Sequence, residues 1–448
     1  MYIAQKGLKV DGHKFISQAI EKGAKAIICE LIPKELGKNV VYVLVKNTAK
    51  TLGIIASNFY DNPSEKIKLV GITGTNGKTS IASLLFELFT KQGCDCGLFS
   101  TVKIQYGDKV YNNSFTTPDA LSLNVHLNNM LKLGITHCFM EVSSHGINQF
   151  RTEGLAFSGG VFTNLTHYHL DYHGDFKNYR YTKKSFFDTL PENAFALTNL
   201  DDKNGAFMLQ NTKAKKYTYA IQQNADYKAK LLEQQFSGML IKIKNQEVWT
   251  SLVGGFNMQN ILAVYVVAEL FEFSQLDILK QISCLKNVEG RFQIFQTPNR
   301  ITVIIDYAHT PNALENVLET INKIRTRNEK LFTILGCGGN RDQEKRPIMG
   351  QIASKHSDKV IFTSDNPRNE DPEKIISQMI DGVSQENFKK ISKITLREEA
   401  IATSAELAQD GDVVLIAGKG HESFQEIQGK YYSFSDLKIA KQIFLNLD

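Results

Sequence analysis

The chain has 448 residues, of which 42% are hydrophobic and 22% charged, a balance typical of globular rather than disordered proteins. Its length exceeds what one hydrophobic core usually serves and indicates several domains. The formal net charge of +5 is too small over this length to indicate nucleic-acid or membrane binding.

The six cysteines are scattered, and the close pair Cys94 and Cys96 lacks the spacing of a zinc site. They are expected to be reduced thiols. No apolar run approaches the roughly 18 residues that span a bilayer, and residues 1–10 lack the pattern of a signal peptide. These features predict a cytoplasmic protein.

The first predicted elements, in residues 12–31, are a helix with apolar positions at helical spacing and then a strand. A polar turn over residues 62–66 precedes a β-branched strand at 67–72 and an amphipathic helix at 80–91. A new domain is therefore predicted to begin near residue 66.

Between that strand and helix, residues 71–79 (GITGTNGKT) have the pattern of a phosphate-binding loop. Backbone N–H groups of such a loop and the dipole of the following helix attract polyphosphate. Lys78 would reach the outer phosphates and Thr79 would offer its hydroxyl to Mg²⁺. The loop is a variant, since Ile72 stands where the strict pattern has its first glycine. A structural glycine turn is the alternative, but the flanking strand and helix favour ATP binding.

Two further apolar runs, at 138–142 and 160–163, are predicted to be buried parallel strands whose C-terminal ends line a ligand crevice. The first contains Glu141, a candidate Mg²⁺ ligand. The second precedes His167, His169 and His173, whose spacing favours hydrogen bonding and one hard-metal contact over a closed zinc site.

Four more strands are predicted at 301–306, 331–335, 359–363 and 412–417, each before a turn or helix. They indicate a second doubly wound α/β domain that starts near residue 298. The predicted fold class is α/β with three domains: a small N-terminal α/β domain at 1–65, a central phosphate-loop domain with a parallel sheet at 66–297, and a C-terminal Rossmann-like domain at 298–448.

These motifs, taken in order, resemble those of the Mur ligase family of bacterial cell-wall synthesis nearly from end to end. The loop at 74–79 is similar to the family's ATP loop, and His169-Leu170-Asp171 to its histidine motif. Residues 254–260 resemble its segment with nucleotide-side asparagines, 290–292 its hinge arginine, and 306–311 the start of its C-terminal domain.

The resemblance implies roles for individual residues. Implied catalytic residues are Lys78, Glu141, His169, Lys183 and Arg291. Implied ATP-binding residues are Gly74, Thr75, Asn76, Gly77, Lys78, Thr79, Ser80, Asn257, Asn260, Arg291, Asp306 and His309. Two Mg²⁺ ions would be held by Thr79, Glu141, His169 and Lys183, the last as a carbamate formed with CO₂. Its neighbour Lys184 is expected on the helix surface.

The peptide and amino-acid sites follow from the same resemblance. Implied contacts to the UDP-linked dipeptide are Thr116, Thr117, Ser143, Gln149 and Arg151. Implied contacts to the incoming amino acid are Arg341, Asp365, Asn366, Pro367, Arg368, Gly418 and Glu422. Asp365-Asn366-Pro367-Arg368 is similar to the motif of the branch that adds meso-diaminopimelate, whose extra carboxylate a guanidinium can grip with two hydrogen bonds.

The implied reaction transfers the γ-phosphoryl group of ATP to the terminal carboxylate of UDP-MurNAc-L-Ala-D-Glu, and the amine of meso-diaminopimelate then attacks the acyl phosphate. This is a step of peptidoglycan precursor synthesis, on which cell shape and division depend. ATP, two Mg²⁺ ions and these two substrates are the expected ligands, and the enzyme is expected to be a monomer without nucleic-acid or membrane partners.

Alternatives remain open at this stage. One is the same reaction with L-lysine. Another is a folylpolyglutamate-synthetase-like ligase, which lacks the Thr-Thr-Pro and Asp-Asn-Pro-Arg motifs. The third is a nucleotide-regulated binding protein without turnover.

Two features depart from the family pattern. Tyr168 stands where relatives usually have an aspartate. Residues 2–7 resemble a strand that in relatives follows an Asp-Ser-Arg segment, so either the start lies upstream or the UDP-binding domain at 1–65 is reduced.

Overall fold

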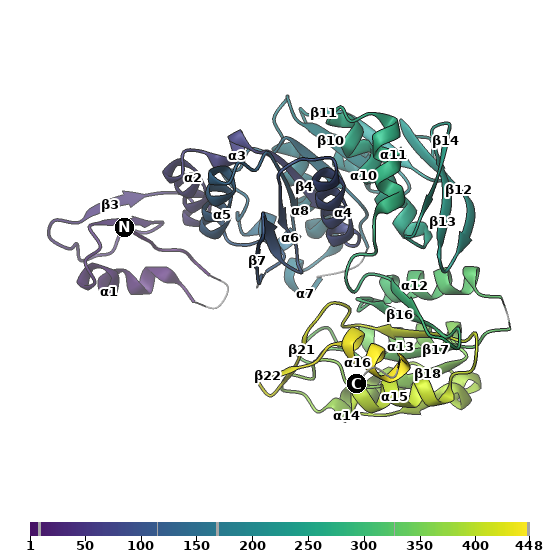
Figure 1. The fold of residues 1–448 in the computed structure, drawn as a ribbon. Coiled ribbons are helices and arrows are strands. Elements are labelled where there is room, and N and C mark those ends of the chain that lie inside the picture. The colour runs from purple at the N-terminus through teal and green to yellow at the C-terminus, as the bar shows by residue number, and fades with distance from the viewer. Residues whose placement is uncertain (8–9, 114, 167–169, 327, 446–448) are drawn as a thin grey trace. The chain divides into compact units, whose positions relative to one another are not determined.

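The computed structural model describes residues 1–448 except 8–9, 114, 167–169, 327 and 446–448 (Figure 1). The chain forms two compact units. The first comprises residues 1–165 and 175–219, and the second comprises 166–174 and 220–448. The three predicted domain limits stay a prediction.

The N-terminal part of the first unit is a small α/β segment, as predicted for residues 12–31. Its elements are β1 (Tyr2–Ile3), η1 (Gly12–Phe15), α1 (Ile16–Glu21), β2 (Ala26–Cys29), β3 (Val41–Leu44), α2 (Thr48–Phe59) and α3 (Pro63–Lys66). The three strands form a parallel sheet in the order β1-β2-β3. Asp11 caps η1 by accepting a hydrogen bond from the His13 N–H.

The main sheet of the first unit has the order β11-β10-β9-β4-β8-β5-β6-β7. The strands are β4 (Lys68–Thr73), β5 (Cys96–Phe99), β6 (Ile104–Tyr106), β7 (Lys109–Tyr111), β8 (His137–Glu141), β9 (Gly159–Phe162), β10 (Phe195–Asn199) and β11 (Lys215–Ala220). The helices are α4 (Lys78–Lys91), α5 (Ala120–Lys132), α6 (Ser144–Asn148), α8 (Phe176–Asp188) and α9 (Gly205–Met208). All pairs are parallel except β5 with β6 and β6 with β7.

The register of this sheet brings several loops to one edge. Ile72 of β4 pairs with Glu141 of β8, and Thr73 pairs with Phe162 of β9. The segments that follow these strands therefore leave the same edge of the sheet. In parallel α/β sheets this carboxyl edge is where ligands bind.

The second unit contains an antiparallel meander and two long helices (Figure 1). Its elements are α7 (Leu170–His173), β12 (Tyr227–Gln235), β13 (Gly238–Ile243), β14 (Gln246–Thr250), α10 (Gly255–Leu270) and α11 (Gln275–Cys284). α10 packs against β12 and α11, which in turn packs against β14.

The rest of the second unit is a six-stranded sheet in the order β15-β16-β20-β17-β18-β19, parallel except for β15. The strands are β15 (Gln293–Gln296), β16 (Thr302–Asp306), β17 (Leu331–Leu335), β18 (Lys359–Phe362), β19 (Ile391–Lys393) and β20 (Val413–Ala417), with a hairpin β21 (Phe424–Ile427) and β22 (Lys430–Ser433). The helices are α12 (Pro311–Ile324), α13 (Lys345–His356), α14 (Pro372–Ile380), η2 (Gln385–Lys390), α15 (Arg397–Leu407) and α16 (Asp436–Leu445).

The central strands β16, β17, β18 and β20 of this sheet bury both faces. In β16, Ile304 belongs to one core cluster with α12, α13 and α14, whereas Val303 and Ile305 belong to the other with α15 and α16. This alternation explains why the strands read as continuous apolar runs. The four strands predicted for this domain are confirmed, as is the α/β class.

Other expectations concern thiols and membranes. All six cysteines are free. Among the residues that the structure describes, no helix combines the length and apolar character needed to cross a bilayer.

Candidate active site

The phosphate loop connects β4 to α4 with two glycines in backbone conformations that favour glycine. Gly74 has φ +146° and Gly77, the N-cap of α4, has φ +87°. A Cβ on Gly74 would lie 1.9 Å from Thr163 Oγ1, so no other residue fits there without displacing the next strand end. The predicted strand–loop–helix arrangement is present.

The loop is also tied to the end of β9. The Asn76 N–H donates to Asn164 Oδ1 at 3.0 Å, and Thr163 Oγ1 donates to the Asn76 carbonyl at 2.6 Å. The Thr75 N–H donates to the Asn164 carbonyl at 2.8 Å. These bonds fix the loop before any phosphate binds. Thr79 and Ser80 are both buried and lie in the first turn of α4, directly after the loop.

Two lysines converge on one carbonyl of this loop. Lys78 Nζ donates to the Gly74 carbonyl at 3.0 Å and to that of Thr75 at 2.8 Å. Lys183 Nζ, from α8, donates to the same Gly74 carbonyl at 2.9 Å. Burial, with the nearby Lys78 charge, lowers the pKa of Lys183 well below its usual value. Lys78 and Lys183, both predicted site residues, thus lie side by side.

The expectation that Lys184 lies on the helix surface is wrong. Only 4% of its side chain is exposed, and Nζ pairs with Asp188 Oδ1 at 2.6 Å. Lys184 also lies over the ring of Phe207, 5.6 Å from its centroid. α8 buries both neighbouring lysines, but only Lys183 contacts the loop among the interactions described.

Glu141 ends β8 as a buried carboxylate. Its Oε1 accepts from the Thr101 N–H at 2.6 Å, and its Oε2 accepts from Thr101 Oγ1 at 3.1 Å. Thr101 lies in the loop after β5, and it was not singled out from the sequence. The strand before it, β5, was not predicted either; the apolar residues of 96–99 are the signal that could have indicated a strand end there.

The residues predicted to bind the UDP-linked dipeptide lie together around Glu141. Thr117 Oγ1 donates to the Glu141 carbonyl at 2.9 Å and lies 3.0 Å from Ser143 Oγ. Arg151 donates to the Thr117 carbonyl at 2.6 Å and to Gln149 Oε1 at 2.7 Å. Thr116 Oγ1 lies within hydrogen-bonding distance of Thr101 Oγ1, at 3.1 Å. All five predicted residues join one hydrogen-bonded cluster with Glu141.

His169, the third predicted metal ligand, lies outside the described residues, as does Tyr168. The side chain of Asp171 is likewise outside the description.

In the second unit, the residues predicted to bind ATP form two groups. On α10, Asn257 and Asn260 are buried and joined by a 3.2 Å hydrogen bond from Asn260 Nδ2 to Asn257 Oδ1. At the end of β16, Asp306 Oδ2 accepts from the Phe292 N–H at 2.7 Å. The Arg291 guanidinium lies 4.4 Å from the centroid of the Tyr307 ring.

Burial shifts the titration of three groups beside that ring. The pKa of Asp306 rises to about 6 through burial, against the opposing effect of Arg291. The pKa of His309 falls to about 3 through burial and the charge of Lys345, and that of His421 falls to about 3 through burial and the charge of Arg291. Both imidazoles are therefore neutral at pH 7.

The residues predicted to bind the incoming amino acid lie at the carboxyl edge of the second sheet. Asn366 Nδ2 donates to Glu422 Oε2 at 2.8 Å. A Cβ on Gly418 would lie 2.8 Å from Asp365 Oδ2, and one on Gly339 would lie 1.9 Å from the Pro367 carbonyl. Arg341 lies exposed in the loop after β17.

Arg368 has a left-handed backbone, with φ +52°, and two partners within the chain. Its Nε pairs with Glu426 Oε2 at 3.0 Å and its Nη1 donates to the Gly339 carbonyl at 2.8 Å. About a fifth of the side chain, 22%, is exposed. The guanidinium is therefore oriented by the protein, and part of the side chain stays exposed.

Two further residues of this region carried no predicted role. His421 Nδ1 is buried and has no hydrogen-bond partner among the described residues. Lys419 is fully buried. Both lie between Gly418 and Glu422, which were predicted to bind the amino acid. Their place within this motif could therefore have indicated them.

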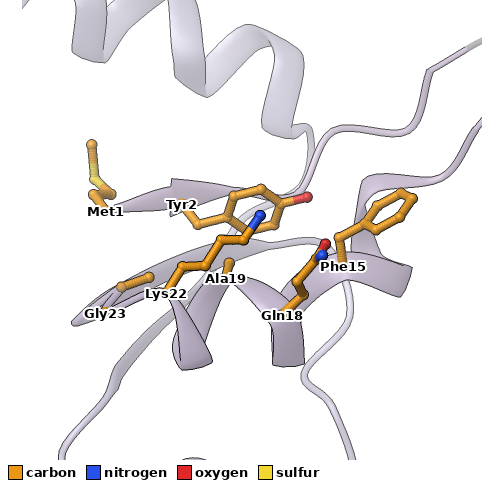
Figure 2. Close-up of a pocket in the computed structure, with 8 residues that line it drawn as sticks. Met1, Tyr2, Phe15, Gln18, Ala19, Lys22 and Gly23 are labelled. Atoms are coloured by element: carbon orange, nitrogen blue, oxygen red, sulfur yellow. The ribbon is translucent and has the colours of Figure 1, made fainter.

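A shallow cavity of about 380 Å³ lies in the N-terminal segment. Figure 2 shows Tyr2 from β1 facing side chains from the η1 and α1 segment, among them Phe15, Gln18 and Lys22. None of the predicted site residues lines it.

Sequence comparison assigns the family. Profiles described as "Mur ligase family, catalytic domain", "Mur ligase middle domain" and "Mur ligase, glutamate ligase domain" match residues 1–60, 72–268 and 290–420. A relative from Cytophaga hutchinsonii, named UDP-N-acetylmuramoyl-L-alanyl-D-glutamate--2,6-diaminopimelate ligase, is 50% identical over 99% of this chain and 91% of its own. The chain belongs to the Mur ligase family.

Other members of the Mur ligase family agree. A protein of the same name from Phocaeicola vulgatus is 49% identical over 100% of this chain and 92% of its own. A solved structure with that name in its title is 33% identical, with a TM-score of 0.70 over 99% of this chain and 91% of that one. The chain is thus an enzyme of the ligase class with the Mur ligase fold.

Proposed function

We propose that this Mur ligase uses ATP to add meso-diaminopimelate to UDP-MurNAc-L-Ala-D-Glu, as a cytoplasmic and monomeric enzyme of peptidoglycan precursor synthesis. The observation that carries the proposal is identity of about 50% over nearly the full chain with relatives that bear this name. The Asp365-Asn366-Pro367-Arg368 segment at the carboxyl edge of the second sheet supports the same choice of amino acid.

ATP phosphates would bind at the loop of residues 74–79. Its N–H groups and the N-terminus of α4 provide partial positive charge, and Lys78 adds a full one. Lys78 now donates to two carbonyls of its own loop, so a phosphate would replace one or both as its acceptor. Asn257, Asn260, Arg291, Asp306 and His309 are proposed as further ATP-binding residues because the resemblance to the Mur ligase family implies that role. The buried Nδ1 of His421, which has no hydrogen-bond partner among the described residues, suits a ligand that donates a hydrogen bond there.

Magnesium fits the oxygen donors of the first unit. Glu141 is a carboxylate only 1% exposed, with no cation paired to it among the described residues, and buried carboxylates usually have one. Glu141 and the Thr79 hydroxyl would hold one ion, and a modified Lys183 would be a ligand of the second. Bound Mg²⁺ would neutralise phosphate oxygens during transfer.

Lys183 would act as a carbamate. Its neutral amine attacks CO₂, a C–N bond forms, and one proton leaves, so an ammonium is replaced by an anionic oxygen ligand. The lowered pKa of Lys183 favours the neutral amine that this step needs. Conversion would also remove the repulsion between Lys78 and Lys183 at the Gly74 carbonyl.

The dipeptide would bind at the cluster of Thr116, Thr117, Ser143, Gln149 and Arg151. Arg151 offers the positive charge that an anionic substrate needs, and the hydroxyls offer hydrogen bonds. The substrate carboxylate attacks the γ-phosphorus, ADP leaves, and an acyl phosphate forms. The amine of the amino acid then attacks its carbonyl carbon, phosphate leaves, and the amine proton is lost to base or solvent.

One assay tests the proposal against the alternatives. Phosphate release is measured with the purified enzyme, ATP, Mg²⁺ and UDP-MurNAc-L-Ala-D-Glu, with meso-diaminopimelate, L-lysine or no amino acid. Release that depends on meso-diaminopimelate, with the tripeptide product seen by mass spectrometry, supports it. Release with L-lysine alone points to the lysine-adding reaction. No release under any condition, with binding retained, points to a protein without turnover.

A further inference from the structure

A fully buried ammonium lies beside the proposed amino-acid site without a part in the mechanism above. Lys419 follows Gly418 at the end of β20 and has no exposed side-chain surface. Lysines are almost never buried to this degree unless paired. Its position and burial raise the question of what the charge holds in place.

Lys419 contacts two residues that the proposed function uses. Its Nζ donates to Glu422 Oε2 at 2.9 Å and to Asn366 Oδ1 at 3.1 Å. It also lies 5.8 Å from the centroid of the Phe424 ring. One buried charge therefore joins the loop after β20 to the loop after β18.

Asn366 completes the same network. Its Oδ1 accepts a second hydrogen bond from the Glu426 N–H at 2.9 Å, and its Nδ2 donates to Glu422 Oε2. Turning the amide over would point its N–H groups at the Lys419 ammonium and at the Glu426 N–H. The network thus fixes one orientation of the Asn366 side chain.

The network leaves one oxygen of Glu422 available. Oε2 accepts from both Lys419 and Asn366, whereas Oε1 has no hydrogen-bond partner in the described part of the chain. A fifth of the Glu422 side chain is exposed. A carboxylate held by one oxygen presents the other to solvent as an oriented acceptor for an ammonium group.

Arg368 provides the opposite charge at the same edge. Its Nε and Nη1 are engaged with Glu426 and Gly339, while Nη2 has no hydrogen bond to any described residue. An anionic acceptor and a cationic donor, both oriented by neighbours, suit an amino acid whose side chain ends in an ammonium and a carboxylate.

We propose that Lys419 is a positioning residue for the incoming amino acid: it holds Glu422 and Asn366 in the orientation that binds the distal ammonium and carboxylate end. This proposal rests on the proposed function for the identity of the amino acid. Without the ammonium, Glu422 would lose its buried counter-charge and turn toward solvent.

The test compares Lys419→Met with the wild type, using steady-state kinetics for each of the three substrates. We expect the KM for meso-diaminopimelate to rise tenfold or more, with kcat and the KM values for ATP and the UDP-linked dipeptide changed less than threefold. The matched control is Arg325→Met, which removes a half-buried cation paired with Asp358 ahead of β18, far along the strand from this edge. It should lower thermal stability and leave all three KM values unchanged.

A double-mutant cycle separates positioning from loss of structure. If Lys419 acts through Glu422, adding Lys419→Met to Glu422→Gln raises the KM for the amino acid less than twofold further. A similar rise in all three KM values, full additivity in the cycle, or no change would overturn the proposal. Lys419→Gln, which keeps an N–H donor, replaces Lys419→Met if that protein does not fold, and failure of both to fold makes Lys419 purely structural.

The kinetics of the wild type distinguish failure of the proposed function from failure of the proposed role of Lys419. If the wild type does not use meso-diaminopimelate, the proposed function fails, and the variants are then scored with whichever amino acid it does use. If the wild type uses it and the variants show no selective change in its KM, only the role of Lys419 fails.

Discussion

Replacing Asp306 by asparagine is expected to stabilise the protein at pH 8 and to leave its stability unchanged near pH 4. Burial raises the pKa of this carboxyl to about 6, although Arg291 is close and the Phe292 N–H donates to it at 2.7 Å. Asparagine has nearly the same shape and keeps an oxygen for that N–H. It has no charge to desolvate.

The size of the effect follows from the pKa. The gap between about 6 and the ordinary value of 3.8 is roughly 2 pH units, and one unit corresponds to about 1.36 kcal/mol. The folded protein binds the proton more tightly than the unfolded chain, so wild-type stability is favoured below pH 4 and falls as the pH rises to 6. Above pH 6 the ionised Asp306 lowers the free energy of unfolding by about 3 kcal/mol, which Asp306→Asn restores.

Urea unfolding at pH 4, 6 and 8 measures this difference. Trp249, the single tryptophan, lies in β14 of the same unit and reports unfolding by its fluorescence. The control is Asp436→Asn, which breaks the fully buried ion pair with Arg397 and should destabilise the protein at pH 8 by about 3 to 5 kcal/mol. An Asp306→Asn protein no more stable than the wild type at pH 8, or stabilised equally at pH 4, would refute the reasoning.

Three further predictions concern the site. Lys183→Ala should abolish ligation and regain part of it with added short-chain carboxylic acids, whereas Lys184→Ala should keep ligation; wild-type activity in the Lys183 variant would contradict the carbamate. Arg368→Ala should raise the KM for meso-diaminopimelate tenfold or more without changing that for ATP, because a charge-assisted pair is lost, and an unchanged KM would remove Arg368 from the site. Gly74→Ala should weaken ATP binding at least tenfold in calorimetry, since its Cβ would overlap Thr163, and normal binding would show that the loop can shift.

Strands β4, β8 and β9 of the first unit and β16, β17, β18 and β20 of the second could be predicted from sequence, because strands buried on both faces appear as continuous apolar runs. β5 and β10 are also fully buried and were not predicted. β15 and β19 were not predicted, since edge strands are short and depend on a partner for their hydrogen bonds. The meander of β12, β13 and β14 was missed for a related reason: its residues alternate in burial, and exposed polar positions interrupt the apolar pattern.

The candidate site could be predicted as a set of motifs but not as a set of contacts. Short motifs carry their own local geometry, as the loop around Gly74 does. Contacts between motifs depend on tertiary structure: Lys419 and Asn366 are 53 positions apart, and neither residue type indicates the other. Nor could helical periodicity decide between Lys183 and Lys184, because α8 buries both.

The aligned strand ends of the second sheet bear on how such an enzyme could change its amino acid. Asp306 and Leu335 both pair with Ala417, and Leu335 also pairs with Phe362, so four strands end at the same level. The loops that follow them contain all the candidate contacts to the amino acid, while the residues before that level are committed to the two cores. Insertions or exchanges beyond the last pair can therefore alter the choice of substrate without disturbing packing. A one-residue insertion before it would shift a loop by about 3.3 Å and exchange the two faces of its strand.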